Sequence, residues 1–391
     1  MIHSRKLTYL ILGIVLLFNI IGMTIYSYLG RYLQYLGTEK IFIQIIVTLI
    51  PLSSFIFPPI FGKLSDRLQN RKIFILIGGV SLPIIYLLFI FIQNLTFIII
   101  LVLLYGVSSS LLGLSFILFQ EIVFNDQSYI SYYNSMVVLG WFLGAQLGGI
   151  FIDIYGIQNL FLFLLVFSFI NLGLLVFLEE ERDIIIEGFE NYEAQQKKLN
   201  LLIEDGEFPL NTSIYYALLF RNFGIRPIMS ILTIIMAFHL SSDSEIGFLI
   251  GFNPLIQFFL MILMGKLISV KNQKIFMVIG YLLSSIVIFG YIISIDFFSF
   301  LFFQILVSFS YSMFWSATHF YIAQNTTPRN KGKYISLANS SFYLGSFSGG
   351  LFFSGLLLVN SDYYVAMIPL IFFPLLSALI IILKFRNLEG E

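Results

Sequence analysis

The hydrophobic and polar positions of this chain are segregated into long blocks. Apolar runs of about twenty residues, enough for a helix to cross the hydrocarbon core of a bilayer, are separated by short polar segments. None of the runs alternates apolar and polar residues as a lipid-facing barrel strand would. The pattern therefore predicts an all-α integral membrane protein with twelve transmembrane helices, at residues 8–34, 41–61, 73–92, 96–119, 130–152, 159–178, 213–240, 246–264, 275–294, 297–322, 334–358 and 362–383.

One long polar segment divides these helices into two sets of six. It predicts three parts: an N-terminal six-helix bundle at 1–178, a cytoplasmic linker at 179–210 and a C-terminal six-helix bundle at 211–391. The two sets repeat one another, since PLSSFIFPPIFGKL from Pro51 aligns with PLIQFFLMILMGKL from Pro254, and KIFILIG from Lys72 aligns with KIFMVIG from Lys274. Two related bundles with a site between them, near the middle of the membrane, are an architecture of transporters.

Composition agrees with this class and excludes others. The chain is 59% hydrophobic and 11% charged, with 45 phenylalanines, whereas soluble domains have about 25% charged residues. Cysteine is absent, which excludes disulfides, thiolate metal sites and cysteine nucleophiles. The formal net charge of zero gives no reason to expect a nucleic-acid partner.

Basic residues predict the orientation in the membrane. Most of the 21 lysines and arginines fall on one side if both termini are cytoplasmic; the exceptions are Arg31, Lys40, Arg221 and Arg226. Cytoplasmic loops carry such an excess of basic residues. We therefore expect a multi-pass protein of the cell membrane with both termini inside.

A charged cluster lies between the second and third predicted helices, within FGKLSDRLQNRK at 61–72. With this cluster the chain resembles the major facilitator superfamily over nearly its whole length. The motif of that family is matched by Gly62, Leu64, Ser65, Asp66, Arg67, Arg71 and Lys72, and Gln69 stands where the family usually has glycine. The resemblance implies the general transporter fold of the family, with alternating access and a small-molecule substrate.

In the family such a cluster acts as a conformational latch that holds the outward-facing state. By resemblance, the expected latch residues are Gly62, Asp66, Arg67, Arg71, Lys72 and Glu121. Gly62 would let two helix ends approach closely, and Glu121 is the expected partner of Arg67 or Arg71. The alternative is that the charges only anchor a cytoplasmic turn.

Glycines spaced by four predict close helix packing in both halves. They are Gly140, Gly144, Gly148 and Gly149 in the fifth helix, and Gly345, Gly349 and Gly350 in the eleventh. The first group resembles a motif associated with antiporters in the family. Ala145 replaces the proline of that motif and Ser131 its leading glycine, so helix packing explains the group as well as antiport does.

Arg226 is the first candidate for substrate binding. It lies midway along the seventh helix, where a charge costs about 2.5 to 3.5 kcal/mol on insertion scales and usually faces protein or water. Asn222, Ser230 and Thr233 share its helix face. A guanidinium in a cavity favours a carboxylate or phosphate; the alternative is a structural arginine bonded to carbonyl groups. Arg221 is expected to snorkel toward the membrane surface.

The resemblance implies that helices 1, 4, 7 and 10 line the cavity. Asn19, Tyr26, Trp315 and His319 are the other expected lining residues, although the same residue types also serve in helix packing. No carboxylate lies deep in any predicted span. Coupling to a proton, through Glu121, His319 or the substrate itself, and exchange with a counter-anion therefore both stay open, as does uncoupled transport.

Catalysis has no support in the sequence, because phosphate-loop, metal-ligand and nucleophile-base patterns are missing. We expect no enzyme activity and no cofactor, and a monomer in the lipid bilayer. The first hypothesis is a secondary transporter of a small organic solute, with an organic anion as the candidate that Arg226 favours. The alternatives are an efflux pump for amphiphilic drugs or lipids, and a transport-dead membrane sensor or scaffold.

Overall fold

A computed structural model describes residues 2–68, 70–123, 127–178, 211–326 and 328–385. These residues are helical and contain no strand, and they include 12 helices long and apolar enough to cross a membrane. The predicted all-α fold with twelve spans is confirmed. The predicted linker at 179–210 lies outside the described residues.

The first half of the chain consists of the following elements: α1 Ile2–Tyr35, α2 Lys40–Leu68, α3 Arg71–Phe91, α4 Leu95–Leu112, α5 Leu114–Ile122, α6 Gln127–Tyr155, η1 Ile157–Asn159 and α7 Leu160–Val176. The second half consists of α9 Ser213–Ala237, α10 Asp243–Leu267, α11 Gln273–Ile293, α12 Phe297–Gln324, α13 Pro328–Val359, α14 Tyr363–Met367, η2 Ile368–Ile371 and α15 Phe372–Lys384. Two spans contain a break: α4 continues as α5 beyond Gly113, and α14 continues through η2 into α15.

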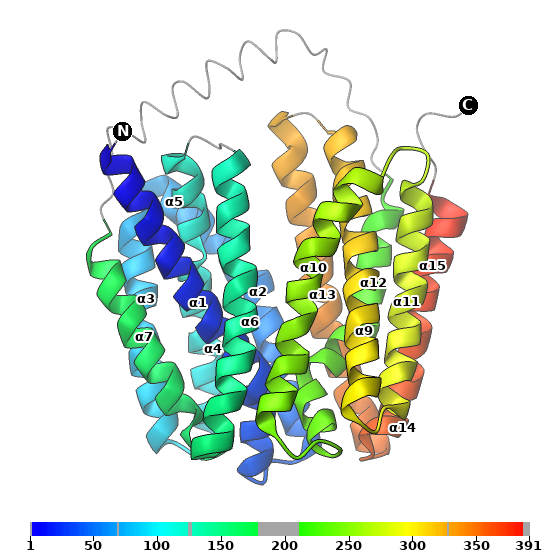
Figure 1. Ribbon diagram of the computed structural model, residues 1–391, viewed down its shortest axis with the longest axis horizontal. Helices are drawn as coiled ribbons and strands as arrows, with labels where there is room; N and C mark the ends of the chain where they lie inside the picture. The colour runs from blue at the N-terminus through cyan, green and yellow to red at the C-terminus, as the bar shows by residue number, and fades with distance from the viewer. Residues whose placement is uncertain (1, 69, 124–126, 179–210, 327, 386–391) are drawn as a thin grey trace.

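The two halves lie side by side in Figure 1, with α1–α7 in one group and α9–α15 in the other. The ends of the helix bundle are named here by the chain termini: the terminal end carries the start of α1 and the end of α15, and the distal end is opposite. Helices α1, α6, α9 and α13 run from the terminal to the distal end, and α2, α10 and α12 run in the opposite direction.

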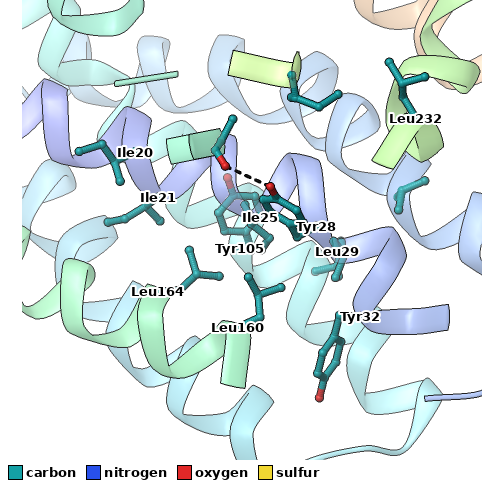
Figure 2. Close-up of a cluster of buried hydrophobic side chains, with 14 of the residues drawn as sticks. Ile20, Ile21, Ile25, Tyr28, Leu29, Tyr32, Tyr105, Leu160, Leu164 and Leu232 are labelled. Carbon is teal, nitrogen blue, oxygen red and sulfur yellow. Dashed lines mark hydrogen bonds between the residues drawn. The ribbon is translucent and has the colours of Figure 1, made fainter. Parts of the chain in front are cut away.

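Buried apolar side chains of both halves form one large hydrophobic cluster, and a second cluster lies within the second half. In the first half, Ile21 and Ile25 of α1 lie near Leu160 and Leu164 of α7, with Tyr105 of α4 beside them (Figure 2). The predicted glycine packing joins α6 to α1: a Cβ at Gly144 would lie 2.4 Å from the carbonyl oxygen of Ile20.

The same kind of packing joins α13 to α9 in the second half. A Cβ at Gly345 would lie 2.2 Å from the carbonyl oxygen of Leu219, and one at Gly349 would lie 2.1 Å from that of Phe223. Small residues let the helix backbones approach closely. Each half therefore holds its long central helices as one packed unit.

Contacts between the halves gather at the distal end. Helix α6 meets α10 there, and α2 meets α13. Gly149 and Gly350 lie at these two junctions: a Cβ at Gly149 would be 2.2 Å from the carbonyl oxygen of Asp243, and one at Gly350 would be 2.1 Å from Oγ1 of Thr48. The two glycines thus occupy corresponding places in the two repeats.

The helices of the two halves separate toward the terminal end (Figure 1). Helices α6 and α10, adjacent at the distal end, diverge toward the terminal end in Figure 1. A Cβ at Gly62 of α2 or at Gly265 of α10 would meet no atom within 4 Å. The close approach predicted at Gly62 is not made by the described residues in this conformation, and it stays a prediction for the conformation with the terminal ends closed.

Candidate functional site

Arg226 lies at the boundary between the two halves. Its half-buried guanidinium is 5.4 Å from the ring centre of Tyr26 on α1 and 4.9 Å from that of Phe342 on α13. Within the described part of the chain, Arg226 forms no ion pair with a carboxylate. The aromatic faces attract its positive charge without neutralising it.

The rest of the α9 face continues toward the distal end along the same boundary. Thr233 donates from Oγ1 to the carbonyl oxygen of Ser27 on α1 at 2.6 Å. Ser230 lies between Thr233 and Arg226, and its Oγ is 3.5 Å from Nε2 of Gln44 on α2. Three of the four positions predicted to share a face therefore meet the opposite half.

Asn222 does not share that environment. It is fully buried, donates to the carbonyl oxygen of Leu218 at 2.7 Å and accepts from Arg221 at 3.0 Å. Its side chain is thus occupied within the second half. In this conformation the Asn222 amide is bonded within the second half and not turned toward the boundary, so its place in the cavity stays a prediction.

Arg221 does not snorkel. Its side chain is buried inside the second half, where Nε donates to Oγ of Ser284 at 3.1 Å and the guanidinium lies 4.4 Å from the ring centre of Phe314. Like Arg226, it forms no ion pair among the described residues. The two guanidinium groups, separated by five residues along α9, therefore make the centre of the protein electropositive.

An aromatic wall extends from Arg226 along α12. Phe342 contacts Trp315 with ring centres 5.7 Å apart, and Trp315 stacks on Tyr311 at 5.6 Å. The ring of His319 lies 4.3 Å from that of Trp315, and its Nδ1 is 3.0 Å from the carbonyl oxygen of Trp315. Trp315 and His319 are both half-buried, as residues at the edge of an accessible space would be.

Asn19 lies on the same helix as Tyr26 but has a structural contact of its own. Its Nδ2 donates to the carbonyl oxygen of Val15 at 2.8 Å, and a Cβ at Gly140 would lie 2.6 Å from its Cβ. The residue is half-buried. Asn19 therefore packs against Gly140 of α6 and is also partly exposed.

Gln44 was missed by the sequence reasoning. It is 0% exposed, its Nε2 reaches Thr48 Oγ1 at 3.3 Å and Ser230 Oγ at 3.5 Å, and its Oε1 has no hydrogen-bond partner among the described residues. An amide within the apolar run 41–61 was the available signal, since a polar side chain inside a membrane span usually faces protein or a cavity.

The expected latch contains a tight ion pair. Nε of Arg71 donates to both carboxylate oxygens of Glu121 at 2.8 and 2.9 Å, and its NH2 group donates to Oε1 at 2.6 Å. Arg71 also donates to Oγ of Ser65 at 2.8 Å and pairs with Asp66 at 2.8 Å. Glu121 is therefore the partner of Arg71.

Other members of the expected latch are arranged differently. Arg67 is exposed and Lys72 is half-buried. Arg71, Asp66 and Glu121 all belong to the first half, so the ion pairs between them do not join the halves in this conformation. Lys274 is the counterpart of Lys72 in the second repeat. It donates to the carbonyl oxygens of Ile382 at 3.0 Å and Phe385 at 3.1 Å.

Charged residues close the distal end. The carboxylate of Asp153 on α6 accepts from the backbone N–H groups of Asp243 at 2.6 Å and Ser244 at 2.7 Å, and from Oγ of Ser242 at 2.7 Å. Arg31 of α1 forms an ion pair with the side chain of Asp243. Both interactions connect the first half to the beginning of α10.

Metal ligands do not gather in the described residues: no group of three or more His, Cys, Asp or Glu side chains is placed to hold a metal ion. The geometry offers instead a central cation, aromatic faces and a bundle closed at one end. Two six-helix halves arranged in this way have the architecture of a membrane transporter.

The comparison with protein families gives the same class. The Major Facilitator Superfamily matches residues 10–220 and 212–391, so the chain belongs to this superfamily. It is a multi-pass membrane transporter and not an enzyme, and its fold is that of a secondary transporter.

Solved structures match the whole chain at low sequence identity. A nucleoside transporter, NupG, has a TM-score of 0.77 at 10% identity, with 97% of this chain and 100% of that chain covered. A D-xylose-proton symporter has a TM-score of 0.76 at 14% identity, with 100% and 99% covered. The inward-open xylose transporter XylE from E. coli has a TM-score of 0.73 at 13% identity, with 99% and 98% covered. No curated protein matches the sequence.

Proposed function

We propose that this protein moves a small organic anion across the membrane by alternating access, and that Arg226 binds the anion. The observation that carries the proposal is the position of Arg226, half-buried at the boundary between the halves with aromatic neighbours and no carboxylate partner among the described residues. A charge at the middle of a span is costly. An anionic solute would neutralise it.

The excess of basic residues assigns the terminal end to the cytoplasm. The conformation closed at the distal end then faces inward. In this assignment the charged cluster around Arg71 is the cytoplasmic latch, and it would engage the second half only when the terminal ends close. The junctions at Gly149 and Gly350 would separate in the same movement.

Two modes of coupling fit the site. Histidine is a common proton carrier in proteins, and His319 lies beside Trp315 on the aromatic wall. Exchange for a counter-anion needs no proton carrier and uses Arg226 in both directions. The absence of a carboxylate deep in the predicted spans favours exchange over the use of an acidic proton carrier.

An efflux pump for amphiphilic compounds is the second candidate, and the wall formed by Tyr311, Trp315 and Phe342 is the observation that favours it. The charge of Arg221 and Arg226 argues against cationic compounds, which both groups would repel. Anionic amphiphiles fit both the charge and the wall. A protein that only senses such a compound would bind it without moving it.

Ligand-dependent thermal stabilisation of the purified protein tests the site. Carboxylates and phosphates should raise the melting temperature, because a ligand that binds only the folded state stabilises it. Arg226→Met should abolish this effect, whereas Lys266→Met, at an exposed position near the terminal end, should leave it intact. Stabilisation by anions that survives in Arg226→Met would refute the assignment, and flux in proteoliposomes separates transport from sensing.

A further inference from the structure

We propose that Gln44 is a second solute contact and that it selects anions which also carry a hydroxyl group. The inference rests on the proposed function, since it takes Arg226 as the anion site. Its basis is the unpartnered Oε1 of Gln44, an acceptor on a fully buried side chain at the boundary between α2 and α9.

The hydrogen bonds around Ser230 determine which end of the Gln44 amide is unpartnered. Oγ of Ser230 donates to the carbonyl oxygen of Pro227 at 2.6 Å. A hydroxyl has one hydrogen to donate, so Ser230 can only accept from Gln44. The orientation in which the amide nitrogen faces both Ser230 at 3.5 Å and Thr48 at 3.3 Å therefore makes both contacts, and it leaves the carbonyl oxygen open.

An open acceptor in this position is costly. A buried polar atom without a hydrogen bond costs about 1–3 kcal/mol, and replacing Gln44 by an apolar residue would remove that cost. Its retention in an apolar span makes sense if a donor reaches it during the transport cycle. Gln44 belongs to the first half and Arg226 to the second, so a solute that contacts both couples its binding to their relative movement.

The spacing limits the size of the solute. Ser230, which contacts Gln44, is four residues from Arg226, a rise of about 6 Å. Helical side chains lean toward the N-terminus of their helix, which here carries the guanidinium toward the terminal end and away from Gln44. The guanidinium of Arg226 and Oε1 of Gln44 are then roughly 6–11 Å apart. A hydroxy acid of four to six carbons spans that gap once a hydrogen bond of about 2.9 Å is counted at its ends.

The charge of the site favours a hydroxyl over an ammonium as the donor. Gln44 offers a neutral oxygen, and the described residues place no carboxylate beside it. An ammonium would be buried with a single neutral partner and repelled by Arg221 and Arg226, and a buried charge without a counter-charge is strongly disfavoured. The solute class inferred is therefore a small hydroxycarboxylate, not an amino acid.

Binding of three matched ligands tests this inference: 6-hydroxyhexanoate, hexanoate and 6-aminohexanoate, together with the corresponding four-carbon series. Isothermal titration of the purified full-length protein should show the hydroxy acid binding about tenfold tighter than its parent acid, the effect of one buried hydrogen bond. The amino acid should bind more weakly than either. Gln44→Met should remove the preference for the hydroxyl while leaving the affinity for hexanoate unchanged, which also shows that the variant is folded.

Thr48→Val is the matched control, since it removes a hydroxyl from the same cluster and retains the Gln44 acceptor; it should keep the preference. The inference is overturned if neither hydroxy acid binds tighter than its parent in the wild-type protein, or if Gln44→Met keeps the preference. Loss of all binding in Arg226→Met together with an unchanged preference in Gln44→Met would refute the role of Gln44 alone. Anion binding that survives in Arg226→Met would refute the proposed function itself.

Discussion

The carboxylate of Asp153 accepts a hydrogen bond from the backbone N–H of Asp243 at 2.6 Å, and this bond crosses from the first half to the second. The first N–H groups of a helix have no partner within it, and a negative charge is favoured there. Asp153 therefore caps α10 from the opposite half. This cap exists only while the distal end is closed.

Asp153→Ala should shift the protein toward the conformation open at the distal end. Hydrogen bonds to a charged group contribute about 1.5–3 kcal/mol each, so losing the cap should change the population ratio by about tenfold or more. Spin labels at Gln158→Cys and Asn360→Cys, both exposed at the distal end, would report the change by distance measurement. The chain has no native cysteine, so labelling is specific.

Asp296→Ala is the control for this experiment. Asp296 caps α12 within its own half, where it accepts from the N–H of Ser299 at 2.8 Å. Its loss should lower stability and leave the distance between the labels unchanged. A distribution that stays at the closed distance in Asp153→Ala would show that the cap does not hold the halves together.

Gly149→Ala and Gly350→Ala should also favour opening at the distal end. A methyl group at either position would clash across the boundary, at 2.2 Å from Asp243 O and 2.1 Å from Thr48 Oγ1. Gly345→Ala makes a comparable clash with Leu219 at 2.2 Å, but within one half. Gly345→Ala should lower the melting temperature without changing the distance between the labels at positions 158 and 360. If all three variants changed that distance equally, the clash across the boundary would not be the cause of opening.

Gly62→Leu and Gly265→Leu should hold the protein in the conformation described here, with the distal end closed and the terminal ends apart. Both positions have free space at the terminal end, which disappears if the terminal ends close. The variants should therefore fold normally, hold labels at Tyr132→Cys and Lys266→Cys far apart, and slow transport. Gly355→Leu is the control: a Cβ at Gly355 also meets no atom within 4 Å, but this residue is exposed on α13 near the distal end. The variant should leave the label distance as in the wild type. Full transport in Gly62→Leu would refute the idea that Gly62 is needed for the terminal ends to close.

Glu121→Ala should destabilise the first half. It leaves the buried Arg71 without the carboxylate that binds it at 2.6 to 2.9 Å, and breaking such a pair costs about 3 kcal/mol. Arg67→Ala, at an exposed position, should change the free energy of unfolding by less than about 0.5 kcal/mol. Denaturant unfolding in detergent measures both, and equal stability of the two variants would show that Arg71 does not depend on Glu121.

Part of the site was predictable because a charge in an apolar run must face protein or water, and regularly spaced glycines indicate close helix packing. Arg226 was found at the boundary between the halves for this reason, and Gly144 and Gly345 pack as their spacing indicated. Asn222 shares the helix face of Arg226, but its amide bonds to Leu218 and Arg221 within the second half, and helical periodicity carries no information on such local bonds. Gln44 was missed, because a single amide carries no periodic signal.

The sequence by itself determined the number of spans, since the cost of burying polar groups in hydrocarbon acts on each run separately. Matching segments indicated the two repeats, and the motif at 61–72 indicated the superfamily. Only the tertiary structure decided that Arg71 pairs with Glu121, that Asp153 caps a helix of the other half, and that the distal end is closed. These depend on how helices distant in the sequence are rotated and packed against each other. The order of residues along one helix does not contain that information.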